Sequence, residues 1–308
     1  MVEQFDVIAD YQDICGEGPL WNKDEQALYW TDLARKRFYR YVWSDRRPEI
    51  VSEKMQVSGF AFNEGGGVVV TNIEGIWLWD EHSDPVLLAE EVDGRRCVMN
   101  DCIADPEGRV FSGSYRRNAQ GDFEPGAGYL FRVDVDGSVR IVDEGFQLSN
   151  GLGFSPDCRV MYFVDSAQRK IYAYDWQRPD GNIRNRRVFV DVPISEGIPD
   201  GLTVDHEGYV WCAHWFGACV IRYDPDGKIE RRIETPALQT SSVTFGGPEF
   251  SDMFLTSAAK TDSLSIAPTG YDATGGYVGG PVYHAKTDIQ GRGEYMARIR
   301  KPPARNNS

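Results

Sequence analysis

Apolar residues occur along this chain in short runs that are rich in aromatic and β-branched side chains and are separated by polar turn residues. Segments 27–32 and 37–43 show the pattern clearly, with the sequences Ala-Leu-Tyr-Trp-Thr-Asp and Arg-Phe-Tyr-Arg-Tyr-Val-Trp. Runs of this length and composition are typical of β-strands. No window of several turns carries the apolar stripe of a helix. The pattern therefore predicts an all-β protein.

These runs form groups of four that recur along the chain. The groups begin near residues 17, 58, 100, 150, 200 and 242, which gives a period of roughly 40 to 50 residues. Four-stranded propeller blades have this period. We therefore predict that residues 1–308 form one domain, a six-bladed β-propeller of four-stranded antiparallel blades. Residues 280–284 are expected to complete the last blade or to help close the ring.

Four of the groups begin with a polar residue that can bind a ligand through oxygen. These residues are Glu17, Asn100, Asn150 and Asp200. The innermost strand of a propeller blade starts at one face, called the top here, so we expect all four around the top of the central channel. The acidic turns at 105–108, 155–158 and 205–208 then lie at the bottom and are expected to be structural.

Two of these residues, Glu17 and Asp200, would repel each other across a narrow channel. Two unit charges ~4 Å apart cost about 4 kcal/mol at an effective dielectric constant near 20. A divalent cation between the carboxylates would remove this cost. With the amide of Asn150 the oxygen set suits hard cations such as Ca²⁺, Mg²⁺ or Mn²⁺. Alternatively, each side chain caps only its own turn.

Charge and composition restrict the class of partner. The net charge of −14 and the isoelectric point near 4.8 argue against a nucleic-acid partner, which needs a basic surface. There is neither a signal-peptide pattern nor a run approaching the ~18 apolar residues of a membrane span, so we expect no membrane partner. Six cysteines without a CxxC pair indicate reduced thiols and a cytoplasmic location.

Three motifs also resemble a known family. Gly-Glu-Gly-Pro-Leu-Trp at 16–21, the segment 148–157 and Ile-Pro-Asp-Gly-Leu-Thr-Val-Asp at 198–205 resemble the metal-binding signatures of the senescence marker protein/gluconolactonase family, the regucalcin-like lactonases. Segments 244–247 and 253–257 are similar to the sixth blade of that family. The resemblance implies a six-bladed propeller that holds one divalent metal ion (Ca, Mg, Mn, Zn or Fe) through Glu17, Asn150 and Asp200.

The resemblance also implies an activity, the hydrolysis of a sugar lactone to the aldonic acid. An aldonolactone such as glucono-, xylono- or arabinonolactone would be the small-molecule partner of a monomer or weak homo-oligomer. The metal would polarise the lactone carbonyl, and Asp200 would be the base that takes a proton from the attacking water. Asn100 and Glu124 would contact the substrate.

One position departs from the family pattern, because Val98 stands where the family often has an arginine. Arg96, Arg116 and Arg117 are candidates to replace it, and we name Arg116 as a substrate-binding residue. It begins the long third-group loop, residues 116–127, which we expect to cover the site. His214 is expected near the top, where a substrate contact and a core role are both open.

Two other functions fit the same residues. The first is a non-catalytic calcium-binding regulator or sugar-acid sensor, which needs the metal ligands but neither a base nor a pocket for a substrate. The second is a metal-dependent hydrolase of other lactones or of phosphotriesters, since propellers support many chemistries. The pair Trp215-Phe216 and the valine at position 98 keep that second alternative open.

Overall fold

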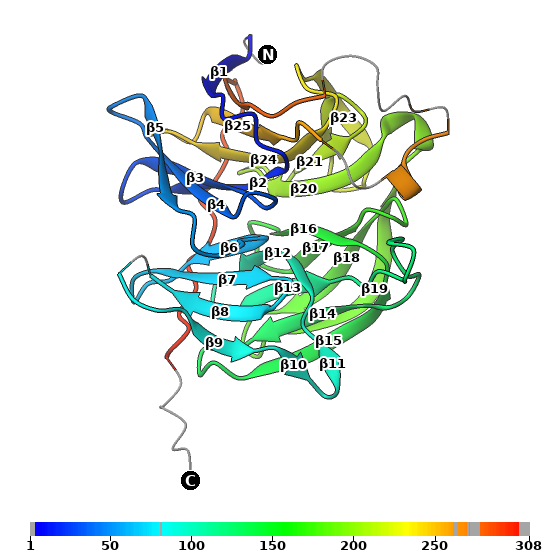
Figure 1. Ribbon diagram of the computed structural model, residues 1–308. Coiled ribbons are helices and arrows are strands. Elements are labelled where there is room, and N and C mark those ends of the chain that lie inside the picture. The colour runs from blue at the N-terminus through cyan, green and yellow to red at the C-terminus, as the bar shows by residue number, and fades with distance from the viewer. Residues whose placement is uncertain (1–3, 81, 261–263, 270, 272–277, 302–308) are drawn as a thin grey trace.

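The computed structural model describes residues 4–80, 82–260, 264–269, 271 and 278–301. Six four-stranded antiparallel sheets form a ring, which confirms the predicted six-bladed β-propeller. The innermost strands of the six blades gather around the centre of the ring (Figure 1). Helical structure in the described residues is limited to two short 3₁₀ turns, Ile194–Glu196 and Leu264–Ile266, and no described helix is long and apolar enough to cross a membrane.

The first three blades follow the chain order from the innermost strand outward. The first contains β2 (Gly16–Asn22), β3 (Ala27–Asp32), β4 (Arg37–Val42) and β5 (Arg47–Ser52). The second contains β6 (Gly59–Phe62), β7 (Val68–Asn72), β8 (Gly75–Trp79) and β9 (Val86–Ala89). After the small hairpin of β10 (Glu91–Val92) and β11 (Arg95–Arg96), the third contains β12 (Met99–Ala104), β13 (Val110–Ser114), β14 (Gly128–Val133) and β15 (Val139–Phe146).

The next two blades repeat this order, and the sixth does not. The fourth contains β16 (Ser149–Phe154), β17 (Val160–Asp165), β18 (Lys170–Gln177) and β19 (Asn182–Asp191). The fifth contains β20 (Ile198–Val204), β21 (Val210–Trp215), β22 (Cys219–Tyr223) and β23 (Ile229–Glu234). The sixth contains β24 (Thr240–Gly246), β25 (Asp252–Ser257), β26 (Val282–Lys286) and, as its outermost strand, β1 (Asp6–Ala9).

The ring is therefore closed by a strand from the start of the chain. Strand β1 pairs antiparallel with β26, with Asp6 opposite His284 and Val7 opposite Tyr283. Residues 280–284 were expected to complete the last blade or to help close the ring. Most of them belong to β26, which is the third strand of the sixth blade. This closure joins the first and last described strands in one sheet and so links the two ends of the ring.

A segment after β26 crosses the bottom of the propeller. His206 donates its backbone N–H to Gln290, and Arg298 donates its own to Gly108, so both contacts involve bottom turns of blades. Asn63 donates its side-chain amide to the carbonyl of Ile299 and accepts a hydrogen bond from the N–H of that residue. These bonds tie the C-terminal part of the described chain to the second, third and fifth blades.

The core lies between neighbouring blades rather than within one sheet. Phe111, Phe154 and Phe163 are buried completely and belong to one cluster between the third and fourth blades. Near the channel the blades approach so closely that only glycine fits. A Cβ added at Gly151 of β16 would lie 2.3 Å from the backbone nitrogen of Leu202 in β20. This close packing fixes the distance between the tops of adjacent inner strands.

Candidate active site

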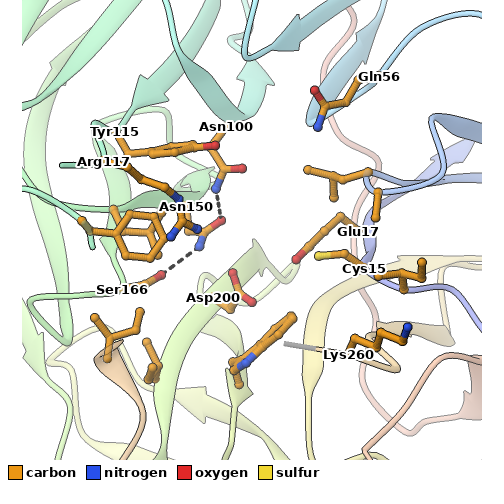
Figure 2. A pocket seen from close by; sticks show the side chains of 18 residues that line it. Cys15, Glu17, Gln56, Asn100, Tyr115, Arg117, Asn150, Ser166, Asp200 and Lys260 are labelled. Atoms are coloured by element: carbon orange, nitrogen blue, oxygen red, sulfur yellow. Dashed lines mark hydrogen bonds between the residues drawn. The ribbon is translucent and has the colours of Figure 1, made fainter. Parts of the chain in front are cut away.

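A cavity of about 410 Å³ opens at the top of the channel, where the inner strands begin. Its lining includes Glu17, Asn100, Asn150 and Asp200, which come from four different blades. Figure 2 shows the carboxylates of Glu17 and Asp200 pointing toward each other, with the two amides on one side of them. The volume lies within the ~300–1,000 Å³ of small-molecule sites. The structure thus brings together the four residues that the repeat pattern placed at the top.

Irregular strand pairing directs these side chains into the cavity. The register between β2 and β3 shifts between Glu17 and Leu20, and that between β20 and β21 shifts between Pro199 and Leu202. The corresponding pairings around Asn100 and Asn150 shift as well, whereas β6 of the second blade pairs regularly with β7. Bulges of this kind re-aim a side chain and are frequent beside functional sites.

The two carboxylates lie in an unfavourable environment for negative charge. Burial, reinforced by the charges of Asp200 and Asp101, raises the pKa of Glu17 well above its usual value, and the N–H of Gly18 opposes this in part. Burial and then the charge of Asp101 raise the pKa of Asp200 in the same direction. Asp200 is 5% exposed, and its buried Oδ1 has no hydrogen-bond partner among the described residues. A cation in the cavity would compensate the negative charge of the two carboxylates and would give Asp200 Oδ1 a partner.

A network of hydrogen bonds fixes the orientation of the two amides. Asn150 donates its Nδ2 to the Ser166 hydroxyl at 2.9 Å, and Ser166 in turn donates to the carbonyl of Pro199 at 2.7 Å. Asn100 donates its Nδ2 to Asn150 Oδ1 at 2.8 Å (Figure 2) and also to the carbonyl of Ser149. A carbonyl oxygen has a second lone pair, so Asn150 Oδ1 keeps capacity for a cation.

Oxygen ligands would dominate a metal centre here. No three His, Cys, Asp or Glu side chains in the described residues gather closely enough to hold an ion by themselves. The candidate centre therefore consists of two carboxylates with amide oxygen, and water would fill the remaining positions. Such a set fits hard cations better than zinc in a closed structural site.

Two residues at or just before the start of the third-blade loop also belong to the site; Tyr115 was not predicted there, and Arg117 was named only as a candidate to replace the family arginine. Tyr115 and Arg117 line the cavity. The Arg117 guanidinium lies 3.9 Å from the centre of the Phe123 ring, and its Nη1 donates to the carbonyl of Gly121 at 2.6 Å. Stacking and hydrogen bonding hold the guanidinium in a defined place.

Three predicted substrate-binding residues do not line this cavity. Arg116 is 70% exposed in its side chain and pairs with Glu124 at 3.0 Å, so these two residues satisfy each other on the outside of the loop. His214 is completely buried, with Nδ1 2.8 Å from the carbonyl of Glu196 and Nε2 3.1 Å from the Tyr223 hydroxyl. Burial lowers the pKa of His214 to about 4. Of its two open roles, the structure favours the core role.

Below the cavity the channel holds a further carboxylate, which the sequence analysis missed. Gly18, Gly59, Gly151 and Gly201 follow the first polar residue in four blades, and Asp101 takes that place in the third. Burial raises the pKa of Asp101 to about 7; the N–H of Cys102 opposes this and the charge of Glu294 adds to it. The break in the glycine pattern was the available signal for this residue.

The fold and this cavity define a class: β-propellers that place carboxylates and amides around one mouth of the central channel. Residues 15–259 match the family model described as the SMP-30/gluconolactonase/LRE-like region. The chain belongs to this family, as the motifs at 16–21, 148–157 and 198–205 predicted.

Known proteins that resemble the chain are named as lactonases and as calcium-binding proteins. The pentonolactonase XacC of Haloferax volcanii is 33% identical over 290 residues, which is 92% of this chain and 95% of that protein. Regucalcin of Xenopus laevis is 33% identical over 247 residues, 79% of this chain and 83% of that protein. The crystal structure of a calcium-binding regucalcin from Agrobacterium tumefaciens superposes with a TM-score of 0.81 at 25% identity, covering 95% of this chain and 97% of that one.

Proposed function

We propose that this protein is a divalent-metal-dependent lactonase that hydrolyses a sugar lactone to the aldonic acid. The observation that carries the proposal is the pair of carboxylates, Glu17 and Asp200, on the floor of a small-molecule cavity, with Asp200 Oδ1 buried and without a hydrogen bond from the described residues. The pentonolactonase relative, at 33% identity over nearly the whole chain, supports a lactone as the substrate. An aldonolactone such as glucono-, xylono- or arabinonolactone is the substrate class we propose.

The residues fit a divalent cation. Glu17, Asn150 and Asp200 would hold it, because all three side chains line the same cavity and the two raised carboxylate pKa values indicate uncompensated charge. A bound cation would act as a Lewis acid that polarises the lactone carbonyl and stabilises its developing negative charge. Calcium is supported by the names of the regucalcin relatives, and Mg, Mn, Zn and Fe remain in the proposed set.

We propose Asp200 as the base. It would both help to hold the cation and take a proton from the water that attacks the carbonyl carbon. Coordination lowers the basicity of this carboxylate, and Glu17 is the less favoured alternative. The bond between the carbonyl carbon and the ring oxygen then breaks, the ring oxygen receives a proton, and the product is the open hydroxy acid. Asn100, Tyr115 and Arg117 would orient the hydroxyls of the substrate.

A matrix of metals and lactones on metal-stripped protein tests the proposal. Hydrolysis releases acid, so a pH-stat follows it directly for glucono-, xylono- and arabinonolactone. We expect no activity without metal, activity with at least one divalent cation, and a rise in melting temperature with the same cation. Equal turnover in the presence and absence of chelator would overturn the metal dependence. Absence of turnover with every lactone and metal would overturn the lactonase.

A calcium-binding regulator or sensor is the alternative that the regucalcin names favour. It predicts that calcium raises the melting temperature and that no lactone is opened. Hydrolysis of aromatic lactones or phosphotriesters alone would instead indicate the third function, for which Trp215 in the cavity wall is the supporting feature. We also propose that the protein acts in the cytoplasm as a monomer or weak homo-oligomer.

Arg117 and Arg116 offer a matched pair for testing substrate orientation. Arg117→Met should lower kcat/KM for the preferred lactone about 10- to 100-fold, because a hydrogen bond from a charged group contributes about 1.5–3 kcal/mol. Arg116→Met removes the same charge from the neighbouring, exposed position and should change kcat/KM less than about threefold. Steady-state kinetics on both variants shows which of the two arginines orients the substrate. A larger loss for Arg116→Met would return the predicted role to that residue.

A further inference from the structure

The walls of the cavity differ in chemistry from one side to the other. We propose that this two-sided cavity selects lactones that carry a methyl group where an ordinary aldonolactone carries a hydroxymethyl group, that is, 6-deoxyaldonolactones. This inference rests on the proposed lactonase function and specifies its substrate class. The evidence is the distribution of hydrogen-bonding and apolar side chains around the carboxylates of Glu17 and Asp200.

One wall can make hydrogen bonds and comes from the third and fourth blades. Asn100, Tyr115, Arg117, Asn150 and Ser166 line this side, and Figure 2 shows them together to one side of the two carboxylates. Their amide, hydroxyl and guanidinium groups offer donors and acceptors for several ring hydroxyls of a sugar lactone. The hydroxyl-rich edge of a substrate is expected to face this wall.

The opposite wall comes from the first blade and is apolar. Ile14 and Cys15 directly precede β2, and Leu33 and Ala34 lie in the turn between β3 and β4; all four line the cavity. Two polar side chains, Gln56 and Lys260, flank this wall at its two ends (Figure 2). Lys260 is exposed, so its ammonium group stays in contact with water.

A third stretch of wall, from the fifth and sixth blades, is apolar as well. Ile198 of β20, Trp215 of β21 and Ile266 lie along it. The indole Nε1 of Trp215 is buried and makes no hydrogen bond with the described residues. Trp215 therefore offers carbon surface, on which the C–H face of a sugar ring or a methyl group can pack.

The described residues of these walls offer few hydrogen-bond partners to one end of a substrate. With the carbonyl at the carboxylate floor and the ring hydroxyls toward the third and fourth blades, the exocyclic end meets the apolar side chains. A hydroxyl there loses its water without a replacement, whereas a methyl group gains apolar contact. An apolar pocket rejects an added hydroxyl only by about 10². We therefore expect a 10- to 100-fold preference in kcat/KM.

Matched lactone pairs test the proposal on the metal-loaded enzyme. L-Fucono-1,4-lactone differs from L-galactono-1,4-lactone only in the terminal hydroxyl, and L-rhamnono-1,4-lactone differs from L-mannono-1,4-lactone in the same way. The D-fucono and D-galactono pair covers the other enantiomeric series. We expect the deoxy member to have the higher kcat/KM, mainly through a lower KM, in at least one pair. Equal values, or preference for the hydroxylated member, in every pair would overturn the inference.

A variant of the apolar wall provides a second test of the proposal. Leu33→Asn keeps the size of the side chain, and asparagine is well tolerated in turns, so the fold should persist. It should reduce the preference for the deoxy member about tenfold by giving the hydroxyl a partner. Leu87→Asn, at an outer strand where the leucine is 39% exposed, is the control and should leave the ratio unchanged.

The outcomes separate this inference from the function on which it rests. If no lactone of any kind is opened, the lactonase itself fails. If ordinary aldonolactones are opened while the deoxy members show no advantage, only the selection of a methyl group fails. An unchanged ratio in Leu33→Asn would overturn the role of the first-blade wall, because that substitution alters the wall without touching the carboxylates.

Discussion

Asp200→Asn is expected to lower kcat/KM for lactone hydrolysis about a thousandfold. Asparagine has nearly the same shape, so the packing around β20 should persist while the negative charge and the base are lost. General bases contribute typically ~10²–10⁴ to rate, and the weaker hold on the cation adds to that loss. The purified variant and wild-type protein are compared in the pH-stat at saturating metal.

Thermal melting of the same variant gives a second and opposite readout. Burial and the charge of Asp101 raise the pKa of Asp200 above its unfolded value, so this carboxyl group destabilises the metal-free fold once the pH exceeds the unfolded pKa. The cost is absent below the unfolded pKa, grows as the pH rises toward the folded pKa and stays constant above it. Metal-free Asp200→Asn should therefore melt at or above metal-free wild type at pH 8, but gain less from added cation.

A charge-matched control is available in the bottom turn after β16. Asp157→Asn removes one carboxylate whose side chain is 59% exposed and should leave both activity and the effect of metal unchanged. A fully active, metal-dependent Asp200→Asn would remove the basis of the proposed mechanism, whatever the melting curves show.

Gly151→Ala is expected to cost about 3 kcal/mol of unfolding free energy, the upper end of the ordinary cost of overpacking. The added Cβ would lie 2.3 Å from the backbone nitrogen of Leu202 and 2.6 Å from the carbonyl of Asp200. These atoms are backbone atoms of β20 and cannot turn away as a side chain can, so β16 and β20 must separate. Because Asn150 and Asp200 stand on these strands, affinity for the cation should fall too.

Urea denaturation and titration with metal measure the two effects. Gly65→Ala is the matched control, since Gly65 is exposed and the nearest atom to its added Cβ is the Asn63 side-chain nitrogen at 3.4 Å. That variant should stay within about 0.5 kcal/mol of wild type. If Gly151→Ala were as stable as the wild-type protein, the inner strands would be packed less closely than the structure indicates.

The blade architecture could be predicted because the chain repeats it. Each group of strands has the same apolar runs and turn residues, so six weak signals support one another. Closure by β1 could not be predicted in this way. Segment 6–9 lies outside the repeat, and its partner β26 is more than 270 residues away, so only the tertiary structure relates them.

The site was predictable to the extent that it depends on the repeat. Glu17, Asn100, Asn150 and Asp200 occupy equivalent positions, and equivalent positions converge in a ring. Residues of the long loop have no such counterpart. Arg116 and Arg117 are adjacent in sequence, yet one pairs with Glu124 at the surface and the other stacks on Phe123 in the cavity. Which of two neighbours points inward depends on the loop conformation, which local pattern does not specify.

The pairing of β1 with β26 has a consequence for biosynthesis. A ribosome makes Asp6–Ala9 more than 270 residues before Val282–Lys286, so β1 stays without its sheet partner while all the strands between them are synthesised. Blades one to five can form as they emerge, whereas the sixth blade must wait for β26. A nascent chain released before residue 282 lacks β26, so β1 has no partner strand and the sixth blade stays incomplete. Its unpaired strand edges would be prone to aggregation.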